Sequence, residues 1–85
     1  MDIIYTAEFM RQYKKLPRDV KIGAVKKETI FKKNPSDPRL KAHKLEGKLK
    51  NFWAFSISFS HRIVYEFGKG RIVYFHSIGT HDIYK

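Results

Sequence analysis

The apolar residues of this sequence change their spacing near residue 45, and this change restricts the chain to one fold class. Before it, Phe9, Tyr13 and Leu16 recur with the period of an amphipathic helix. After it, large and small side chains alternate from Phe52 to Phe59, which is the period of a strand. A chain with helices first and strands afterwards is expected to form an α+β domain.

Two helices are predicted between a short first strand and a proline-rich stop. Residues 2–5 are β-prone, and Thr6 is a suitable N-cap for the first helix. Pro17 ends that helix and suits the first turn of the next, which is expected over 18–33. The segment 34–38, Asn-Pro-Ser-Asp-Pro, stops it. The apolar residues of the second helix fall on two faces, so the pattern leaves its buried face open.

Strands are predicted over 52–59, 62–67 and 71–78, and Gly68-Lys69-Gly70 is expected to form a hairpin turn between the last two. The alternation in the first strand places four side chains on one face: Trp53, Phe55, Ile57 and Phe59. The expected order is therefore β-α-α-β-β-β. This order predicts an antiparallel sheet packed against an N-terminal helical hairpin, in a single domain over residues 1–85.

The residue types that are missing exclude several kinds of chemistry. The 85-residue chain has no cysteine, which removes thiol nucleophiles, disulfides and cysteine-bound zinc. It has no Gly-x-Ser-x-Gly elbow, and its histidines have no recognised metal-ligand spacing, so no metal or other cofactor is expected. Its apolar runs are too short to cross a membrane, and Met1 is not followed by a signal pattern. We therefore expect a soluble, cytoplasmic protein.

Basic residues greatly outnumber acidic ones. Lys and Arg total 18 against 8 Asp and Glu, a net charge of +10, and residues 6–50 contain 14 of the basic and 5 of the acidic side chains. A small domain with this charge attracts nucleic acid or an acidic protein. The alternative is a lysine-rich surface that only keeps the protein in solution.

The side chains left for catalysis are His, Arg, Lys and Tyr, and this set suits cleavage of RNA by internal transfer. In that reaction a base takes the proton of the 2′-hydroxyl, an acid protonates the 5′-oxygen, and a cation stabilises the phosphate. The substrate supplies its own nucleophile, so a small protein needs only to position and neutralise it. Histidine titrates near neutral pH and suits either proton transfer, and arginine offers two donors to phosphate oxygens.

Three segments of the chain resemble the RelE/ParE superfamily of type II toxins. They are the block 44–53 (KLEGKLKNFW), the strand 60–65 (SHRIVY) and the ending 78–82 (IGTHD). The ending is similar to the YafQ branch, and the strand is similar to RelE and YoeB. The resemblance covers essentially the whole chain, and it implies a metal-independent mRNA interferase that cleaves message on the ribosome. It also implies a cognate antitoxin, which would form a hetero-oligomer with a toxin that is monomeric alone.

The resemblance implies roles for individual residues as well. Arg62 matches the strand arginine that contacts the scissile phosphate, and His81 matches the C-terminal histidine that acts as general acid or base. His43 matches a position that holds a histidine or glutamate in such toxins, and Tyr84 resembles the terminal aromatic that stacks on a base. The basic loop 41–51 resembles the segment that holds the RNA backbone. Its implied RNA-binding residues are Lys41, Lys44, Lys48, Lys50 and Asn51.

The sequence departs from the family pattern at one cation. Ser77 stands where the family has a second arginine, which weakens phosphate stabilisation unless Arg71, His76 or a lysine substitutes. Two other functions therefore stay open: a gyrase-poisoning toxin of the ParE kind, and a catalytically weak protein that mainly binds antitoxin or nucleic acid. For Arg62 itself, the alternative is a solvent-facing arginine paired with Glu66 on the same face of its strand.

Several other candidates also have a structural interpretation. His43 lies in an exposed basic loop, where a histidine without function is equally expected. His61 and His76 are expected to be structural or peripheral. Trp53 and Phe55 are expected in the core rather than on a base-stacking surface, because they share the apolar face of their strand.

Overall fold

The computed structural model describes residues 1–84, and of Tyr84 the backbone alone. Its elements follow the predicted order, with one additional short strand, β2. The strands are β1 (Asp2–Tyr5), β2 (His43–Lys44), β3 (Trp53–Ser56), β4 (Arg62–Phe67) and β5 (Ile72–Gly79). The helices are α1 (Ala7–Lys14) and α2 (Arg18–Lys33), and the short 3-10 turns are η1 (Pro38–Leu40), η2 (Gly47–Leu49) and η3 (His81–Tyr84).

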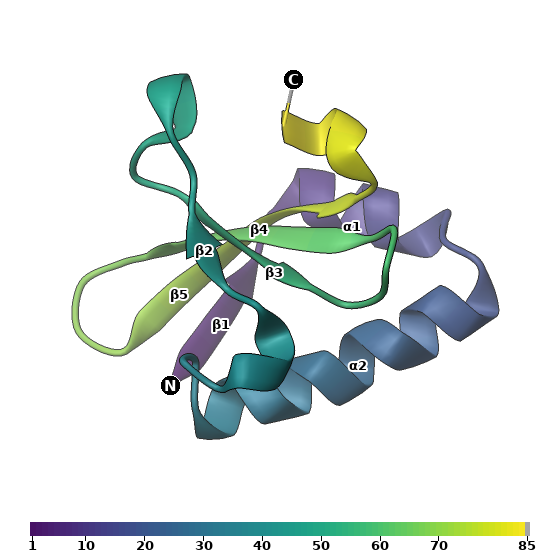
Figure 1. Cartoon of the computed structure of the whole chain (residues 1–85), viewed down its shortest axis with the longest axis horizontal. Helices are drawn as coiled ribbons and strands as arrows, with labels where there is room; N and C mark the ends of the chain where they lie inside the picture. Colours follow the sequence, from purple (N-terminus) through teal and green to yellow (C-terminus); the bar gives the residue numbers. More distant parts are fainter. Residues whose placement is uncertain (85) are drawn as a thin grey trace.

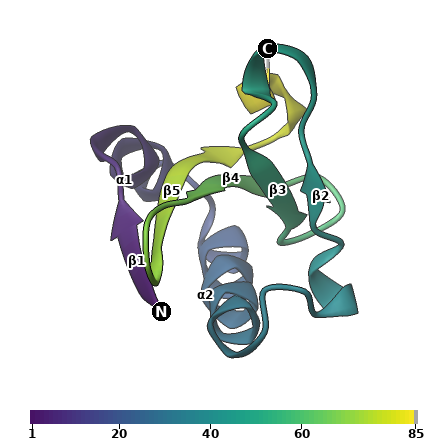
Figure 2. The same cartoon turned by 90° about the vertical axis from the view of Figure 1, so that its left-hand side faces the viewer.

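The strands form one five-stranded sheet in the order β1-β5-β4-β3-β2. Strands β3, β4 and β5 are the predicted antiparallel meander. At one edge β1 lies parallel to β5, with Asp2 opposite Ile72, so the sheet is mixed rather than wholly antiparallel. Parallel pairing is possible here because the long connection between the two strands returns the chain to the end of the sheet where it began. Both helices lie on one side of the sheet (Figure 1 and Figure 2).

Helix α1 begins where the capping pattern predicted. The hydroxyl oxygen of Thr6 accepts a hydrogen bond from the amide of Phe9 at 3.1 Å, as an N-cap does. Helix α2 follows Pro17 and ends, as predicted, before the proline-rich segment. Its buried face, which the sequence left open, is the one that carries Ala24 and Phe31.

An aromatic cluster joins α2 to the sheet and forms the centre of the core. The ring of Phe31 lies 5.1 Å from that of Phe55 on β3 and 4.9 Å from that of Tyr65 on β4. All three side chains are buried, and Trp53 packs half-buried beside the core. The predicted core positions of Phe55 and Trp53 are therefore confirmed. Aromatic side chains of this size supply a large share of the apolar area that a small domain buries.

The predicted strand 52–59 is shorter than expected, because the chain turns before Phe59. The carbonyl oxygen of His61 accepts hydrogen bonds from the amides of Ile57 at 3.0 Å and Ser58 at 3.4 Å, which closes a tight loop after β3. Ile57 stays buried, but the side chain of Phe59 is 98% exposed. The prediction that Phe59 shares the core face was wrong, because the alternation continues into a loop, where it no longer selects one face of a sheet.

The hairpin turn between β4 and β5 forms at Gly68-Lys69-Gly70, as predicted. Gly70 takes a φ of 64°, a left-handed conformation that glycine adopts without strain. Beyond the turn, the register of the two strands shifts between Val64 and Tyr65, which places a bulge in the middle of the hairpin. The register of β4 and β5 near the Gly68-Lys69-Gly70 turn therefore differs by one residue from their register at the far end of the hairpin, where Arg62 pairs with Gly79.

Candidate active site

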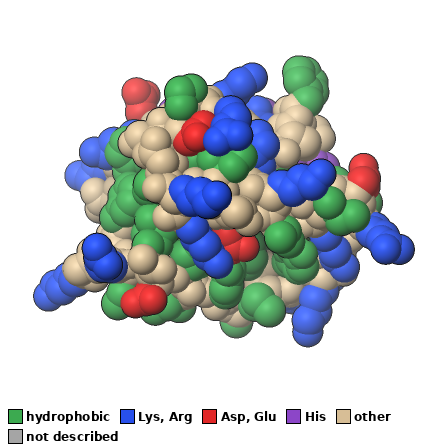
Figure 3. Space-filling model, turned by 90° about the horizontal axis from the view of Figure 1, so that it is seen from below, with side chains coloured by type: hydrophobic (Ala, Val, Ile, Leu, Met, Phe, Trp, Pro, Cys, Tyr) green, Lys and Arg blue, Asp and Glu red, His purple; other side chains and the backbone are tan. Residues whose placement is uncertain are grey.

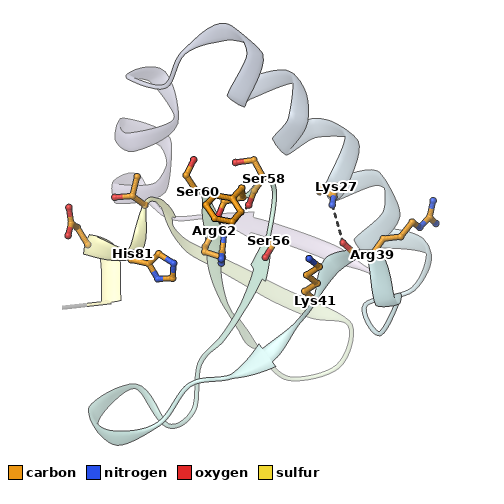
Figure 4. Close-up of a pocket in the computed structure, with 11 residues that line it drawn as sticks. Lys27, Arg39, Lys41, Ser56, Ser58, Ser60, Arg62 and His81 are labelled. Carbon is orange, nitrogen blue, oxygen red and sulfur yellow. Dashed lines mark hydrogen bonds between the residues drawn. The ribbon is translucent and has the colours of Figure 1, made fainter.

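A pocket of about 760 Å³ opens where the ends of β3, β4 and β5 approach α2. Its lining includes Lys27 of α2, Lys41 after η1, Arg62 of β4 and His81 of η3. Figure 4 shows His81, Arg62, Ser56 and Lys41 following one another across this pocket. The pocket thus joins polar and basic side chains that are far apart in the sequence, as a binding or catalytic site does.

Arg62, the first residue of β4, is held by the loop that precedes it. Its Nη1 donates hydrogen bonds to the carbonyl oxygens of Ser58 at 3.0 Å, Phe59 at 3.2 Å and His61 at 3.1 Å. Within the described part of the chain, Nη1 is the only guanidinium nitrogen that bonds to the protein. The side chain is therefore fixed by one nitrogen, and its other donors are available to an anion.

The ion pair that would make Arg62 a simple surface residue does not form. Oε1 of Glu66 lies 2.9 Å from Nε2 of His76 on β5 instead. The ring of His76 also stacks on Phe52, with 4.7 Å between the ring centroids. Glu66 is therefore engaged by His76 along the same sheet, and the predicted alternative pairing of Arg62 with Glu66 was wrong.

The pairing of β4 with β5 brings His81 to the pocket that holds Arg62. Arg62 is the cross-strand partner of Gly79, the last residue of β5. Thr80 and His81 follow directly, and both line the pocket. The side chain of His81 is exposed at the start of η3, so a ligand in the pocket has access to its ring.

Four Lys and Arg side chains line the pocket, and among residues 1–84 Arg39 is the only one of them that pairs with a carboxylate. Nζ of Lys27 donates to the carbonyl oxygen of Arg39 at 3.0 Å. The Arg39 guanidinium binds Asp37 through Nε at 3.0 Å and Nη2 at 2.8 Å, and these hydrogen bonds lower the pKa of Asp37 to about 2. Among residues 1–84, no carboxylate forms an ion pair with Lys41 or Arg62. Together with Lys27, which is bonded only to a carbonyl oxygen, these two are the cations that an anionic ligand would meet, and the carboxylate of Asp82 lines the same pocket.

Lys41 has an unusual backbone conformation. Its φ of 51° and ψ of 42° are left-handed, which costs about 1–2 kcal/mol for a residue with a Cβ. Its amide donates to the carbonyl oxygen of Pro38 at 3.1 Å and closes η1. Strained residues of this kind gather at functional sites, and this one turns the chain from η1 towards β2 at the rim of the pocket.

His43 does not line the pocket. It lies on β2 opposite Ala54 of β3, and directly opposed residues share one face of a sheet. Two residues further along β3, Ser56 is opposite Arg62. His43 therefore shares a sheet face with Arg62, but β3 lies between their strands. Nδ1 of His43 is 3.4 Å from the carbonyl oxygen of Lys41.

The other residues predicted to bind RNA lie on the β2–β3 hairpin. Lys44 is on β2, and Lys48, Lys50 and Asn51 surround η2 at its tip. All four are exposed. The tip of this hairpin and η3 rise at the same end of the molecule in both views (Figure 1 and Figure 2). Ser56 at the end of β3 lines the pocket, whereas the four basic or amide side chains on β2 and at the tip do not.

Neither Arg71 nor His76 replaces the arginine that is missing at Ser77. Arg71 follows the hairpin turn and lines a different pocket at that end of the sheet. His76 is bound by a carboxylate and does not line the pocket of Arg62. Lys41 and Lys27 do line it, and each is a lysine that could supply a second charge.

Tyr84, the predicted base-stacking aromatic, belongs to η3, but its side chain lies outside the described residues. Its role stays a prediction. In the part of the chain that the structure describes, no three His, Cys, Asp or Glu residues gather as metal ligands would. No described helix is both long and apolar enough to cross a bilayer.

Sequence reasoning missed the loop after β3 as part of the site. Ser56, Ser58 and Ser60 line the pocket together with Phe59. The signal was visible as serine at every second position, but the same alternation also predicts a strand. Hydroxyl groups and a turn-forming composition are equally typical of a loop that offers hydrogen bonds to a ligand.

The surface outside the pocket is also basic. Figure 3 shows the face seen from below in Figure 1, where Lys and Arg side chains spread over the surface with few carboxylates between them. Exposed lysines on α2 include Lys26, Lys32 and Lys33. A field of this sign attracts a polyanion and falls off over a Debye length of about 8–10 Å at physiological salt.

Solved structures show which proteins share this architecture. The YoeB/ParE toxin from Agrobacterium tumefaciens matches with a TM-score of 0.80 at 20% identity, over 95% of this chain and 99% of that one. YafQ from E. coli strain BL21(DE3) matches with a TM-score of 0.80 at 20% identity, over 98% and 96%. The archaeal RelE-RelB complex from Pyrococcus horikoshii OT3 matches with a TM-score of 0.75 at 13% identity, over 93% and 92%. No protein-family model and no curated protein sequence matches the chain.

The chain therefore has the fold of these solved toxins, over nearly the full length of both chains. This confirms the predicted α+β fold and the resemblance to these toxins in architecture. Because the identities are 13–20%, the comparison establishes the architecture, and the chemistry has to be argued from the residues of this chain.

Proposed function

We propose that this protein is the toxin of a type II toxin-antitoxin system and that it is a metal-independent endoribonuclease acting on mRNA at the ribosome. The observation that carries the proposal is that Arg62 and His81 line one pocket, with Lys41 as a second cation. The fold shared with YoeB/ParE, YafQ and RelE toxins supports the class. The net charge of +10 suits a polyanionic substrate.

The proposed reaction needs two proton transfers. A base removes the proton of the 2′-hydroxyl, and the oxygen attacks the neighbouring phosphorus. The bond to the 5′-oxygen breaks, and an acid protonates that oxygen, which leaves a 2′,3′-cyclic phosphate and a 5′-hydroxyl. His81 is suited to one transfer because imidazole changes its protonation near neutral pH. His43 is proposed for the other. The 2′-oxygen and the 5′-oxygen flank one phosphorus, so His43 has to reach the same phosphate as His81, from the sheet face that it shares with Arg62.

The cations stabilise the charge that develops on the phosphate. Arg62 is already anchored through Nη1, so its remaining donors are oriented before the substrate arrives, and such preorganised donors are worth several kcal/mol in a transition state. Lys41 supplies the charge that Ser77 does not. The remaining proposed RNA contacts are Lys44, Lys48, Lys50, Asn51 and Tyr84.

An antitoxin is the proposed protein partner. Solved structures with this fold include the DinJ-YafQ complex from E. coli and the RelE-RelB complex from P. horikoshii. A basic toxin surface favours a partner segment rich in Asp and Glu, which would fold as it binds. We expect a hetero-oligomer in which the partner covers part of the basic surface.

Cleavage of message on translating ribosomes tests the proposed function. We expect His81→Ala to lower the cleavage rate by about 10²- to 10⁴-fold, as the loss of a general acid or base does. Arg62→Ala is expected to lower it by about 10²-fold or more. Arg71→Ala removes a cation from the other end of the sheet and is the matched control. Equal cleavage by all four proteins contradicts the assignment, and inhibited DNA supercoiling without RNA cleavage indicates a gyrase-directed toxin.

A further inference from the structure

Phe59 is the most exposed large apolar side chain in the described part of the molecule. It is 98% exposed, and the next value, at Val25 on α2, is 52%. A partly exposed apolar residue on a surface needs no explanation. A phenyl ring that buries almost none of its area does nothing for the core, so its contribution has to be sought in binding.

The ring belongs to the pocket that holds the proposed catalytic groups. Phe59 lines this pocket between Ser58 and Ser60, and Figure 4 shows these two serines beside Arg62. Among the described residues, Phe59 is the only one of the lining residues with an apolar side chain. An aromatic ring therefore shares a pocket with hydroxyl groups, cations and the carboxylate of Asp82.

The loop that carries the ring is fixed to Arg62. Nη1 of Arg62 donates to the carbonyl oxygen of Phe59 itself at 3.2 Å and to that of Ser58 at 3.0 Å. The amide of Ile57 closes the loop onto the carbonyl oxygen of His61 at 3.0 Å. The backbone that carries the ring is therefore ordered before a ligand binds, and ordering it again costs nothing. The same hydrogen bonds fix the backbone of Phe59 next to the guanidinium of Arg62.

We propose that Phe59 is a stacking platform for an unpaired nucleobase next to the phosphate that Arg62 binds. The inference rests on the proposed function and adds a base contact to it. Proteins hold single-stranded nucleic acid by combining cations that follow the phosphates with aromatic rings on which bases stack. A protein partner would instead bury a contiguous apolar patch, and polar and basic side chains surround Phe59.

Binding of two fluorescently labelled octamers tests the inference without requiring cleavage. One is an octamer of deoxyadenosine, and the other is an abasic octamer with the same number of phosphates; neither has a 2′-hydroxyl. We expect the wild type to bind the octamer with bases more tightly. Phe59→Ala should weaken that binding by about 5- to 100-fold, the range for loss of one base–aromatic stack, and should leave binding of the abasic octamer unchanged.

Three further variants separate stacking from apolar contact. Phe59→Leu keeps an apolar side chain without a ring and is expected to behave like Phe59→Ala. Phe59→Trp keeps a ring and is expected to bind as tightly as the wild type or more tightly. Phe67→Leu changes an aromatic residue that is 49% exposed outside this pocket, and it should bind both octamers as the wild type does.

Four results would overturn the inference. The first is that Phe59→Ala binds the octamer with bases as tightly as the wild type does, and the second is that Phe59→Ala loses equal affinity for both octamers. The third is that the wild type binds neither octamer at low salt. The fourth is that the wild type is a dimer in sedimentation equilibrium and that Phe59→Ala dissociates this dimer without changing octamer binding. The last would assign the ring to a second copy of the chain. If instead Phe59 governs binding and no RNA is cut, the proposed catalysis fails and this inference stands.

Discussion

Arg62 is the cross-strand partner of Gly79, so the first residue of β4 lies beside the last residue of β5. Because η3 begins two residues later with His81, this pair places the proposed catalytic imidazole and guanidinium at one pocket. The bulge between Val64 and Tyr65 shifts the register between the hairpin turn and this end of the strands. The position of His81 relative to Arg62 therefore depends on the bulge as well as on the turn.

Arg62→Lys is expected to be a poor replacement, although it keeps the charge. An ammonium group has no planar fork, so it cannot hold the carbonyl oxygens of the loop and a phosphate together. We expect cleavage to fall by about 10²-fold and hydrogen exchange at the Ile57 amide to become faster. Arg71→Lys is the control. Normal cleavage by Arg62→Lys would show that the site uses only a positive charge at this position.

Lys41→Gly separates the charge of Lys41 from its strained backbone. Glycine adopts a φ of 51° readily, so the free energy of unfolding should stay the same or rise slightly. Affinity for single-stranded RNA should fall, and the slope of log affinity against log salt concentration should decrease by about 0.7, because one phosphate contact is lost. Lys69→Gly, in the hairpin turn, is the control. An unchanged salt dependence in Lys41→Gly would argue against a phosphate contact.

Phe31→Ala is expected to be among the most destabilising substitutions in the chain. The side chain is fully buried between α2 and the sheet, and removing a buried phenyl ring costs about 3–5 kcal/mol. That is a large share of the stability of a small domain. Urea unfolding of the wild type and Phe31→Ala measures the difference. Val25→Ala, on the exposed side of α2, should change the free energy of unfolding by less than about 0.5 kcal/mol.

Tyr65 makes the stability of the protein sensitive to alkaline pH. Burial raises its pKa to about 12, because the interior disfavours the phenolate, whereas an unfolded tyrosine ionises near a pKa of about 10. The contribution of Tyr65 to the free energy of unfolding is therefore complete below about pH 10, and it is lost as the pH rises towards about 12. The free energy of unfolding of the wild type, relative to Tyr65→Phe, should decrease over this range. An identical pH profile for the two proteins would contradict the assignment.

Much of the fold could be predicted because its signals act between neighbours in the chain. The Thr6 cap, the break between the helices at Pro17 and the glycine turn before β5 each concern a few adjacent residues, and the structure has all three there. The period of the apolar residues likewise separated helices from strands. It failed at Phe59, because alternation alone does not show where a strand ends.

The candidate site could be predicted only in part. Arg62 and His81 were chosen from their sequence context, and the structure brings them to one pocket. His43 was chosen in the same way, and it lies on β2 outside that pocket. The engagement of Glu66 by His76 was not foreseen, since these residues meet only when β4 pairs with β5.

By itself, the sequence determined the order of helices and strands, the basic character of the surface and the residue types available for chemistry. The tertiary structure decided the parallel edge strand β1, the buried face of α2, the exposure of Phe59 and the place of Lys41 in the pocket that holds Arg62. The physical reason is the separation along the chain of the residues that interact. Caps, turns and hydrophobic periods depend on nearby residues, whereas registers and pockets depend on distant segments that meet only when the whole core packs.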